Sequence, residues 1–354
     1  MFIDSDELFY EELTLEPDDD YPYFIIAKRY WTSVPEGEEQ TTLVCLHSTS
    51  FHKETWEPTL SRIFKSSTCS GFLGSKIRDA WVIDCPNHGR SAVLNSTLLQ
   101  LPQHAGSFTC DKYARAVYRF LHSKHFDVKE RHRQNLVGLG HSLGGVAMII
   151  LQSPLLPSVV FRELIIIEPM ISPLGQESLQ PLRTRLVKAS QRRPDTWPDR
   201  AIAQQSLAKT NGILWDPRVL EVYVKYALKV DENSTATEST SVSLCCTKFE
   251  EAAMYQDVDG PIAPVKDLDE ICTRLPIHII FGQLNDFIPK SVQDSIVDPS
   301  SPRRFESISY IPGVGHLVPQ QAPDALAEKI CALLEGKYDR ALTGRQEHDR
   351  RSKL

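Results

Sequence analysis

Long apolar runs are missing from this sequence of 354 residues. A membrane-spanning helix needs about 18 or more consecutive apolar residues. The best runs here, at residues 146–151 and 164–167, have the length of a buried strand or a short core helix. We therefore expect no membrane span.

An excess of basic residues is missing as well. Asp and Glu outnumber Lys and Arg to give a net charge of −7, and no long basic stripe stands out, so nucleic acid is not an expected ligand. The first residues, Met1-Phe-Ile-Asp-Ser-Asp-Glu7, hold no basic residue ahead of an apolar segment, and we expect no secretory signal.

Paired cysteine motifs are also absent. The eight cysteines include no C-x-x-C pair, and Cys245 and Cys246 are merely adjacent. In a chain with no expected secretory signal, this pattern favours reduced thiols in an intracellular compartment over a disulfide framework.

The remaining composition is that of an ordinary globular protein, with 41% hydrophobic and 24% charged residues. At about 150 residues per domain, the length suggests two or three domains. A single α/β fold with an inserted lid reaches the same size, so the order of the elements has to decide.

Short strand patterns alternate with helical patterns along most of the chain. Residues 9–15 and 23–31 predict an N-terminal hairpin. Further strands are expected at residues 42–46, 80–83, 135–139, 164–167, 276–281 and 307–311, and helices at 56–64, 113–121, 144–151 and 325–334. This order predicts an α/β fold with a mostly parallel sheet and helices on both faces.

Residues 169–274 interrupt the alternation. Their pattern is largely helical, as at residues 219–228, and we interpret them as an inserted helical cap. Within the cap, residues 232–243 are rich in Ser and Thr and predict a mobile loop. The expected organisation is therefore a core in two parts (residues 1–168 and 275–335), the cap between them, and a tail at 336–354.

The tail ends in Ser352-Lys353-Leu354, the tripeptide that the peroxisomal import receptor recognises. The preceding residues 336–351 are mostly charged or small, so we expect a solvated tail that a receptor can reach. The peroxisomal matrix is the expected location and the import receptor an expected partner. A chance hydrophilic ending is the alternative.

A candidate nucleophile lies in Gly140-His141-Ser142-Leu143-Gly144, which matches G-x-S-x-G. An apolar strand pattern enters this motif, and a pattern of small and apolar helical residues leaves it. A sharp strand-to-helix turn exposes the serine Oγ, and glycines on either side avoid a collision with neighbouring backbone. We predict Ser142 as the nucleophile; a serine that caps a helix after a strand is the alternative.

The general base is expected after the last strand, where Gly313-Val314-Gly315-His316 places a histidine in a glycine-bracketed loop. A serine followed by a histidine, with an acid between them in the chain, fits this assignment. Asp286, in the loop after the strand at 276–281, is the first candidate for the acid that accepts from His316 Nδ1. Glu168, at the end of an earlier strand, is the alternative.

Two backbone amides are expected to hold an oxyanion beside Ser142. The helix that leaves this serine directs its first N–H groups toward it, which makes the Leu143 amide one donor. The loop His47-Ser48-Thr49-Ser50-Phe51 follows the strand at 42–46 and offers the Thr49 amide as the other. An ordinary turn is the alternative for this loop.

Three segments together resemble, in order, motifs of the α/β-hydrolase fold family. They are the loop Asp84-Cys-Pro-Asn-His-Gly-Arg-Ser91, the Ser142 motif at residues 140–145 and the His316 loop at residues 313–319. The resemblance covers nearly the whole chain. It implies an α/β-hydrolase fold in which an inserted helical cap lies over a Ser-His-acid site.

Two places depart from the family's pattern. Ser48 and Ser50 stand where the family's first loop usually has glycines, and each added Cβ narrows the approach to the oxyanion. Asn285 occupies the position three residues after Gly282 that usually holds the acid. These departures leave an alternative interpretation. In it, the protein has the same fold but is not catalytic, and its cleft binds a ligand or partner.

A narrower similarity concerns Phe51-His-Lys-Glu-Thr-Trp-Glu-Pro58 and, in the cap, Arg192-Arg-Pro-Asp-Thr-Trp197. Both are similar to segments of fungal peroxisomal hydrolases, a group that includes enzymes of host-selective toxin pathways, an acyl-CoA hydrolase of mycophenolic acid biosynthesis and a yeast peroxisomal lipase. This similarity implies a peroxisomal serine hydrolase of secondary (toxin) metabolism that cleaves an ester or thioester. An acyl-CoA thioester is the favoured substrate, and a lipase or carboxylesterase is the alternative activity.

The implied mechanism needs no metal and no cofactor, because serine, imidazole and backbone amides carry each step. An epoxide hydrolase or dehalogenase of this fold would carry aspartate in place of Ser142. Arg185, Lys188 and Arg192 share one helix face that would suit CoA phosphates. A solvated helix face is the simpler interpretation of those three residues.

Overall fold

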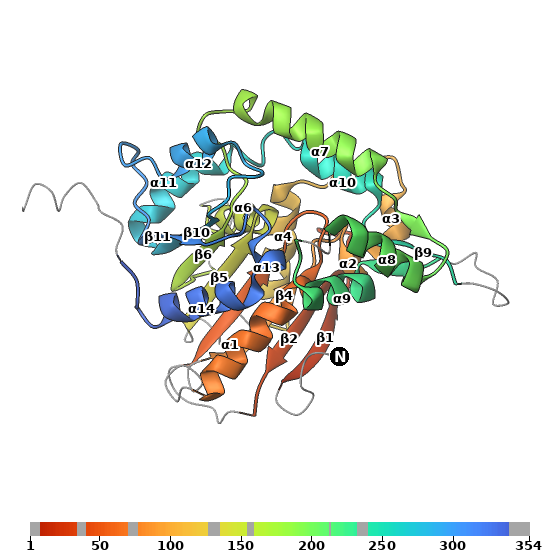
Figure 1. Ribbon diagram of the computed structural model, residues 1–354, viewed down its shortest axis with the longest axis horizontal. Coiled ribbons are helices and arrows are strands. Elements are labelled where there is room, and N and C mark those ends of the chain that lie inside the picture. The colour runs from red at the N-terminus through yellow and green to blue at the C-terminus, as the bar shows by residue number, and fades with distance from the viewer. Residues whose placement is uncertain are drawn as a thin grey trace, which may run out of the picture.

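The computed structural model describes residues 8–33, 40–69, 77–126, 135–153, 159–211, 214–231 and 240–339. These residues form an eight-stranded sheet in the order β1-β2-β4-β3-β5-β6-β10-β11 (Figure 1). The strands are β1 (Phe9–Leu15), β2 (Ile25–Trp31), β3 (Thr41–Leu46), β4 (Ile77–Ile83), β5 (Asn135–His141), β6 (Glu163–Ile167), β10 (Ile277–Gly282) and β11 (Ser307–Ile311). β2 runs antiparallel to β1 and β4, and the other pairs are parallel, which confirms the predicted sheet.

Helices cover both faces of this sheet because its central strands are apolar on both sides. In β6, Leu164 and Ile166 belong to one buried cluster, and Ile165 and Ile167 belong to another. The helices of the first face are α4 (Cys110–Leu121), α6 (Leu143–Ile150) and α11 (Pro264–Arg274), and those of the second are α1 (Glu57–Cys69) and α14 (Pro323–Leu334). A strand buried on both faces is a continuous apolar run, as expected for a parallel sheet covered by helices on both sides.

The cap lies over the carboxyl ends of the parallel strands (Figure 1). Its helices are η2 (Glu177–Leu179), α7 (Gln180–Arg192), α8 (Arg200–Asn211), α9 (Pro217–Tyr226) and α10 (Lys248–Gln256). It also contains a small antiparallel sheet of β7 (Thr196–Trp197), β9 (Val242–Leu244) and β8 (Leu228–Val230), in that order. The helical expectation did not include this sheet, because strands of two or three residues are too short to show an alternating pattern.

Two cap helices begin at residues suited to that position. Asp216 Oδ1 accepts the Arg218 N–H at 2.9 Å at the start of α9. Thr247 Oγ1 accepts the Glu250 N–H at 3.2 Å at the start of α10. Thr-x-x-Glu is a capping-box sequence, and it places Glu250 and Glu251 in the first turn of α10.

Shorter helices complete the described part of the chain: η1 (Lys53–Trp56), α2 (Gly89–Leu94), α3 (Ser96–Leu99), α12 (Lys290–Ile296) and α13 (Val318–Gln321). No helix in the described ranges is long and apolar enough to cross a membrane. Residues 232–239 of the expected mobile loop and the tripeptide Ser352-Lys353-Leu354 lie outside the described residues, while the end of that loop enters β9. The expected domain boundaries stay a prediction.

Candidate active site

Ser142 lies in the turn between β5 and α6, with φ 51° and ψ −114°, a conformation that L-residues rarely adopt. The turn closes because two glycines allow close backbone approach. A Cβ on Gly140 would lie 2.5 Å from the oxygen of Gly144, and a Cβ on Gly144 would lie 2.3 Å from the oxygen of Leu46. The motif's glycines therefore serve the steric purpose that the sequence suggested.

His316 joins this serine to a carboxylate. Its Nε2 lies 3.1 Å from Ser142 Oγ, and its Nδ1 lies 3.1 Å from Glu168 Oε2. The three side chains come from the end of β5, the loop after β11 and the end of β6, so the parallel sheet brings them to one edge. All three residues are at most 5% exposed. With a proton on Nδ1 donated to Glu168, Nε2 is free to accept from the serine.

Asp286 occupies a different place from the one expected. Its Oδ1 accepts the main-chain N–H of His316 at 2.8 Å, and the ring Nδ1 faces Glu168 instead. Gly315 permits this close approach of the Asp286 carboxylate, because a Cβ at position 315 would come within 2.0 Å of Oδ2. The assignment is thus corrected. Asp286 holds the backbone of the histidine loop, and the alternative, Glu168, faces the ring.

Glu168 is oriented by a chain of amide groups. Gly282 N donates to its Oε1 at 2.8 Å, and Gln293 Nε2 lies 3.2 Å from both carboxylate oxygens. Asn285 Nδ2 in turn donates to Gln293 Oε1 at 2.8 Å. The asparagine at the family's usual acid position therefore supports the Glu168 carboxylate indirectly, through Gln293.

The imidazole of His316 is also fixed by packing and through its backbone. The ring of Phe287 stacks on it, with centroids 4.1 Å apart and an angle of 7° between the planes. His141 Nε2 donates to the main-chain oxygen of His316 at 2.9 Å. Burial and the nearby His316 lower the pKa of His141 well below its ordinary value, so His141 is neutral and has a tautomer that can donate at Nε2.

The loop after β3 is folded by a buried, neutral histidine. Burial lowers the pKa of His47 to about 3. Its Nδ1–H donates to the oxygen of Ser48 at 2.8 Å, and its Nε2 accepts the N–H of Cys85 at 3.0 Å. The Phe51 N–H closes the turn on the Ser48 oxygen at 3.2 Å. This turn presents Thr49 at the wall of the cavity that contains Ser142.

The two predicted oxyanion donors lie near Ser142 by different means. Leu143 is the first residue of α6, so its N–H has no carbonyl partner within the helix. Thr49 belongs to the turn described above and borders the same cavity as Ser142. The neighbouring Ser50 has φ 74°, a conformation that favours glycine.

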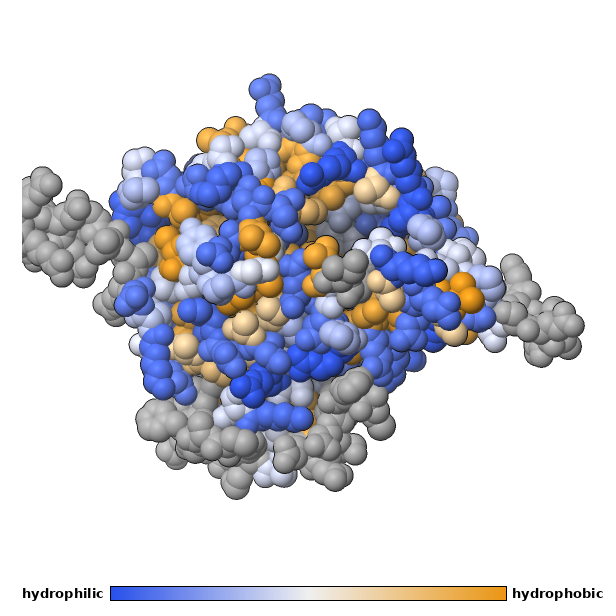
Figure 2. Space-filling view, viewed as in Figure 1, coloured by the Kyte–Doolittle hydropathy of each residue, from blue (hydrophilic) through white to orange (hydrophobic). Residues whose placement is uncertain are grey.

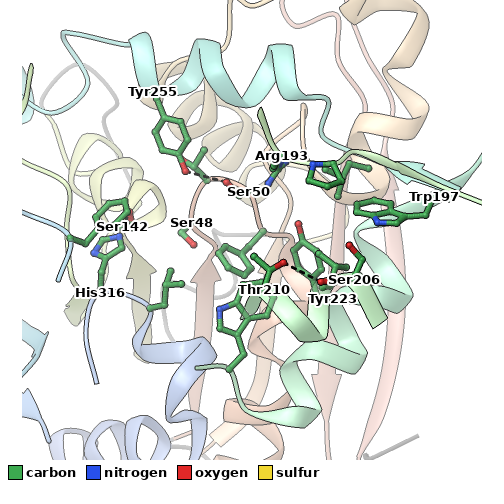
Figure 3. Close-up of a pocket in the computed structure, with 18 residues that line it drawn as sticks. Ser48, Ser50, Ser142, Arg193, Trp197, Ser206, Thr210, Tyr223, Tyr255 and His316 are labelled. Carbon is green, nitrogen blue, oxygen red and sulfur yellow. Dashed lines mark hydrogen bonds between the residues drawn. The ribbon is translucent and has the colours of Figure 1, made fainter. Parts of the chain in front are cut away.

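A cavity of about 250 Å³ extends from Ser142 and His316 into the cap. Its wall is mainly apolar and includes six aromatic residues: Phe51, Trp197, Trp215, Tyr223, Tyr255 and Phe287. Figure 2 shows a hollow between α7 and the pair α8 and α9, with apolar residues around it. In Figure 3, Ser142 and His316 lie at one end of the lining residues and Trp197 lies at the other. An apolar cavity of about 150 Å³ takes benzene, so this one has room for a larger apolar group.

Comparison with known proteins agrees with the fold described above. Residues 43–329 match the family described as "Alpha/beta hydrolase family". The chain belongs to this family. This alpha/beta hydrolase is 24% identical over 227 residues to the abhydrolase domain-containing protein AFT2-1 of Alternaria alternata, with 57% of this chain and 84% of that protein covered. It is 26% identical over 369 residues to the type I acyl-CoA thioesterase mpaH of Penicillium roqueforti, with 86% and 79% covered.

Among solved structures, this hydrolase resembles the peroxisomal alpha-beta-hydrolase Lpx1 of Saccharomyces cerevisiae. The TM-score is 0.71 at 18% identity, and the alignment covers 98% of this chain and 95% of Lpx1. At this identity the likeness concerns the fold. The relatives include acyl-CoA thioesterases, and the solved structures of similar fold include esterases.

Sequence reasoning did not single out Gln293 or Phe287, although both contact the Ser142–His316–Glu168 chain. Phe287 follows Asp286 directly and lies in the loop that the sequence indicates. The sequence offers no local signal for Gln293. Asn285 is instead a signal for Glu168, because an amide at a position where an acid is usual indicates that the carboxylate comes from another strand end.

Proposed function

We propose that this chain is a serine hydrolase in which Ser142, His316 and Glu168 form a catalytic triad. The observation that carries the proposal is the continuous chain from Ser142 Oγ through both ring nitrogens of His316 to Glu168. His316 Nε2 takes the Oγ proton as the serine attacks a carbonyl carbon. Glu168 keeps the proton on Nδ1 and stabilises the imidazolium.

The rest of the proposed reaction follows from the same groups. The Leu143 and Thr49 amides hold the oxyanion, the bond from carbon to the leaving sulfur or oxygen breaks, and His316 gives its proton to the leaving group. His316 then removes a proton from water as the water oxygen attacks the acyl–Ser142 ester. The bond from the acyl carbon to Oγ breaks, His316 returns the proton to Oγ, and the carboxylic acid leaves.

An acyl-CoA thioester is the substrate we favour. The aromatic cavity beside Ser142 suits an apolar acyl group, and mpaH, a relative that covers most of the chain, is named as an acyl-CoA thioesterase. From the similarity of residues 51–58 and 192–197 to segments of fungal peroxisomal hydrolases, we also propose a place in fungal secondary metabolism, including toxin biosynthesis. A lipase or carboxylesterase would use the same triad and is the alternative.

Three basic residues on one face of α7 favour a leaving group that carries negative charge, as CoA does. The guanidinium carbon of Arg185 lies 6.0 Å from the centroid of the Phe287 ring, which itself stacks on His316. Lys188 and Arg192 follow Arg185 along that helix, and all three residues are exposed. We propose that this face attracts the phosphates of CoA. Replacing all three by glutamine should raise KM for an acyl-CoA and leave KM for the matching N-acetylcysteamine thioester unchanged.

The decisive experiment follows thiol release from a panel of acyl-CoA esters by the wild type and by Ser142→Ala. We expect release by the wild type and none by the variant, together with labelling of Ser142 by a fluorophosphonate. Equal rates for the two proteins would refute the mechanism, and absence of labelling would favour a non-catalytic binding protein. Turnover of glycerides without thiol release would assign the protein as a lipase.

We also propose the peroxisomal matrix as the location. Support comes from Ser352-Lys353-Leu354 and from the likeness to Lpx1, a hydrolase named as peroxisomal. A fluorescent protein fused ahead of the chain should enter peroxisomes, and deletion of the tripeptide should leave it in the cytosol. Peroxisomal fluorescence without the tripeptide would show that the tripeptide is not the address.

A further inference from the structure

Ser50, next to the proposed oxyanion donor Thr49, is bound directly to the cap. Its Oγ donates to Glu251 Oε1 and lies 3.1 Å from the hydroxyl of Tyr255 (Figure 3). Both partners belong to α10, a cap helix about 200 positions further along the sequence. The second oxygen of Glu251 pairs with Arg193, which follows α7. The side chain of Ser50 thus links the loop after β3 to the cap.

The backbone of Ser50 is linked to the same helix through three side chains. Ser50 N donates to His88 Nε2 at 3.1 Å, and His88 Nδ1 donates to Asn87 Oδ1 at 2.7 Å. Asn87 Nδ2 then donates to Glu250 Oε2 at 3.1 Å. Burial and the nearby His47 lower the pKa of His88 well below its ordinary value, and a neutral imidazole is what allows Nε2 to accept.

The two glutamates are suited to hold this position. Glu250 and Glu251 are 3% and 4% exposed, and both lie in the first turn of α10, where the helix dipole stabilises carboxylates. Ser50 has φ 74°, a backbone conformation that is strained for a residue other than glycine. Glycine would avoid this backbone strain. Serine differs from glycine here by its hydroxyl, which makes the hydrogen bond to Glu251.

We propose that Glu250 and Glu251 are positioning residues that set the oxyanion loop through Ser50, so that the Thr49 amide is correctly placed only while α10 is docked on the core. The inference rests on the proposed function and extends it to the cap. It also explains why serine replaces the family's glycine at position 50. Serine strains the backbone there, but its hydroxyl can bind a residue of the cap.

Ser50→Gly is the sharpest test, because glycine suits φ 74° and the variant should be at least as stable as the wild type. We expect kcat to fall about 10- to 100-fold with KM little changed, which is less than the about 100- to 1,000-fold loss when an oxyanion donor is removed altogether. Affinity for a trifluoromethyl ketone that forms a hemiketal with Ser142 should fall by the same factor as kcat/KM.

Variants of α10 complete the test. Glu251→Ala should reproduce the kinetic defect, and Glu251→Gln should restore most of the activity, because its amide oxygen can still accept from Ser50. Asp257→Asn is the matched control. Asp257 ends the same helix and accepts the Cys110 N–H at 2.9 Å, so it links α10 to the core away from Ser50. Asparagine keeps an oxygen that can accept this N–H, so α10 stays docked, the contacts of Ser50 are untouched and the control should keep wild-type kcat.

A Ser50→Gly protein with wild-type kcat and ketone affinity would overturn the inference, as would an Asp257→Asn protein with the same kinetic defect. These outcomes differ from failure of the proposed function, in which the wild type shows no Ser142-dependent hydrolysis at all. A lower melting temperature for Glu251→Ala, with unchanged kcat, would assign Glu251 a structural role only and would likewise refute positioning.

Discussion

The two sides of Ser142 are built from different parts of the chain. On one side, His316 and Glu168 are held by Asp286, Gly282 and Gln293, which all belong to the core around β10 and α12. On the other side, the loop that carries Thr49 is held by core residues and also by the first turn of the cap helix α10. The hydrogen bonds described for the proton-transfer side therefore come from the core, and those of the oxyanion side come from both the core and the cap.

This difference teaches how such a site can depend on its cap without a catalytic residue in the cap. The hydrogen-bonded chain through His316 joins residues of the core to one another. The oxyanion site, which supplies a large share of the rate in acyl transfer, is completed by contacts between the loop and the cap. Changes on the core side should therefore alter proton transfer, whereas changes on the cap side should alter stabilisation of the oxyanion.

The largest expected effect comes from the carboxylate on the core side. Glu168→Gln keeps the size of the side chain but favours the wrong tautomer of His316, and loss of the corresponding carboxylate elsewhere costs about 10⁴ in kcat. We expect a fall of about 10³ to 10⁴ in kcat with KM nearly unchanged, measured by thiol or alcohol release at pH 7.

Asp286→Asn is the control for that variant. Asparagine retains an oxygen that can accept the His316 N–H, so kcat should fall by no more than about tenfold. A tenfold fall corresponds to the lower end of the free energy of a hydrogen bond to a charged group. If Asp286→Asn were the more damaging of the two changes, Asp286 would be the acid in solution and the assignment from geometry would fail.

A smaller effect is expected one step further from the ring. Gln293→Leu removes the amide that contacts both oxygens of Glu168, and a hydrogen bond to a charged group is worth about 1.5–3 kcal/mol. We expect kcat to fall about tenfold, with the pH profile of kcat/KM altered as well, because the carboxylate is less well stabilised. Gln204→Leu, the same change at an exposed position of α8, should leave both unchanged.

The fold and two of the site residues were predictable because they depend on local patterns. Strands buried on both faces are continuous apolar runs, and Ser142 and His316 each lie in a short glycine motif. The choice between Asp286 and Glu168 was not predictable, since both follow strands of the same sheet. It depends on which carboxylate reaches the ring and which one reaches the backbone, and this is settled by contacts between distant segments.

The contact between Ser50 and Glu251 is even harder to predict from the sequence. Each residue has an ordinary local role, one in a turn and one in the first turn of a helix. Their pairing requires the cap to fold back over the sheet, and no periodicity in the sequence records it. What the sequence did contain was the departure itself, a serine where glycine is usual, and the structure gives that departure a physical reason.

The last expected effect is on stability in acid, and it arises on both sides of Ser142, because the pKa of His141 on the His316 side is lowered as well. His47 and His88, on the oxyanion side, are neutral in the folded state, with the pKa of His47 lowered from 6.5 to about 3. Between these values the unfolded chain binds more protons, so the free energy of unfolding should fall as pH drops below about 6.5, by up to about 1.4 kcal/mol per pH unit for each imidazole. Urea unfolding at pH 7, 6 and 5 measures this slope, which His88→Gln should reduce. A flat profile in the wild type would mean that these imidazoles are not held neutral, and protonated His88 could not accept from Ser50.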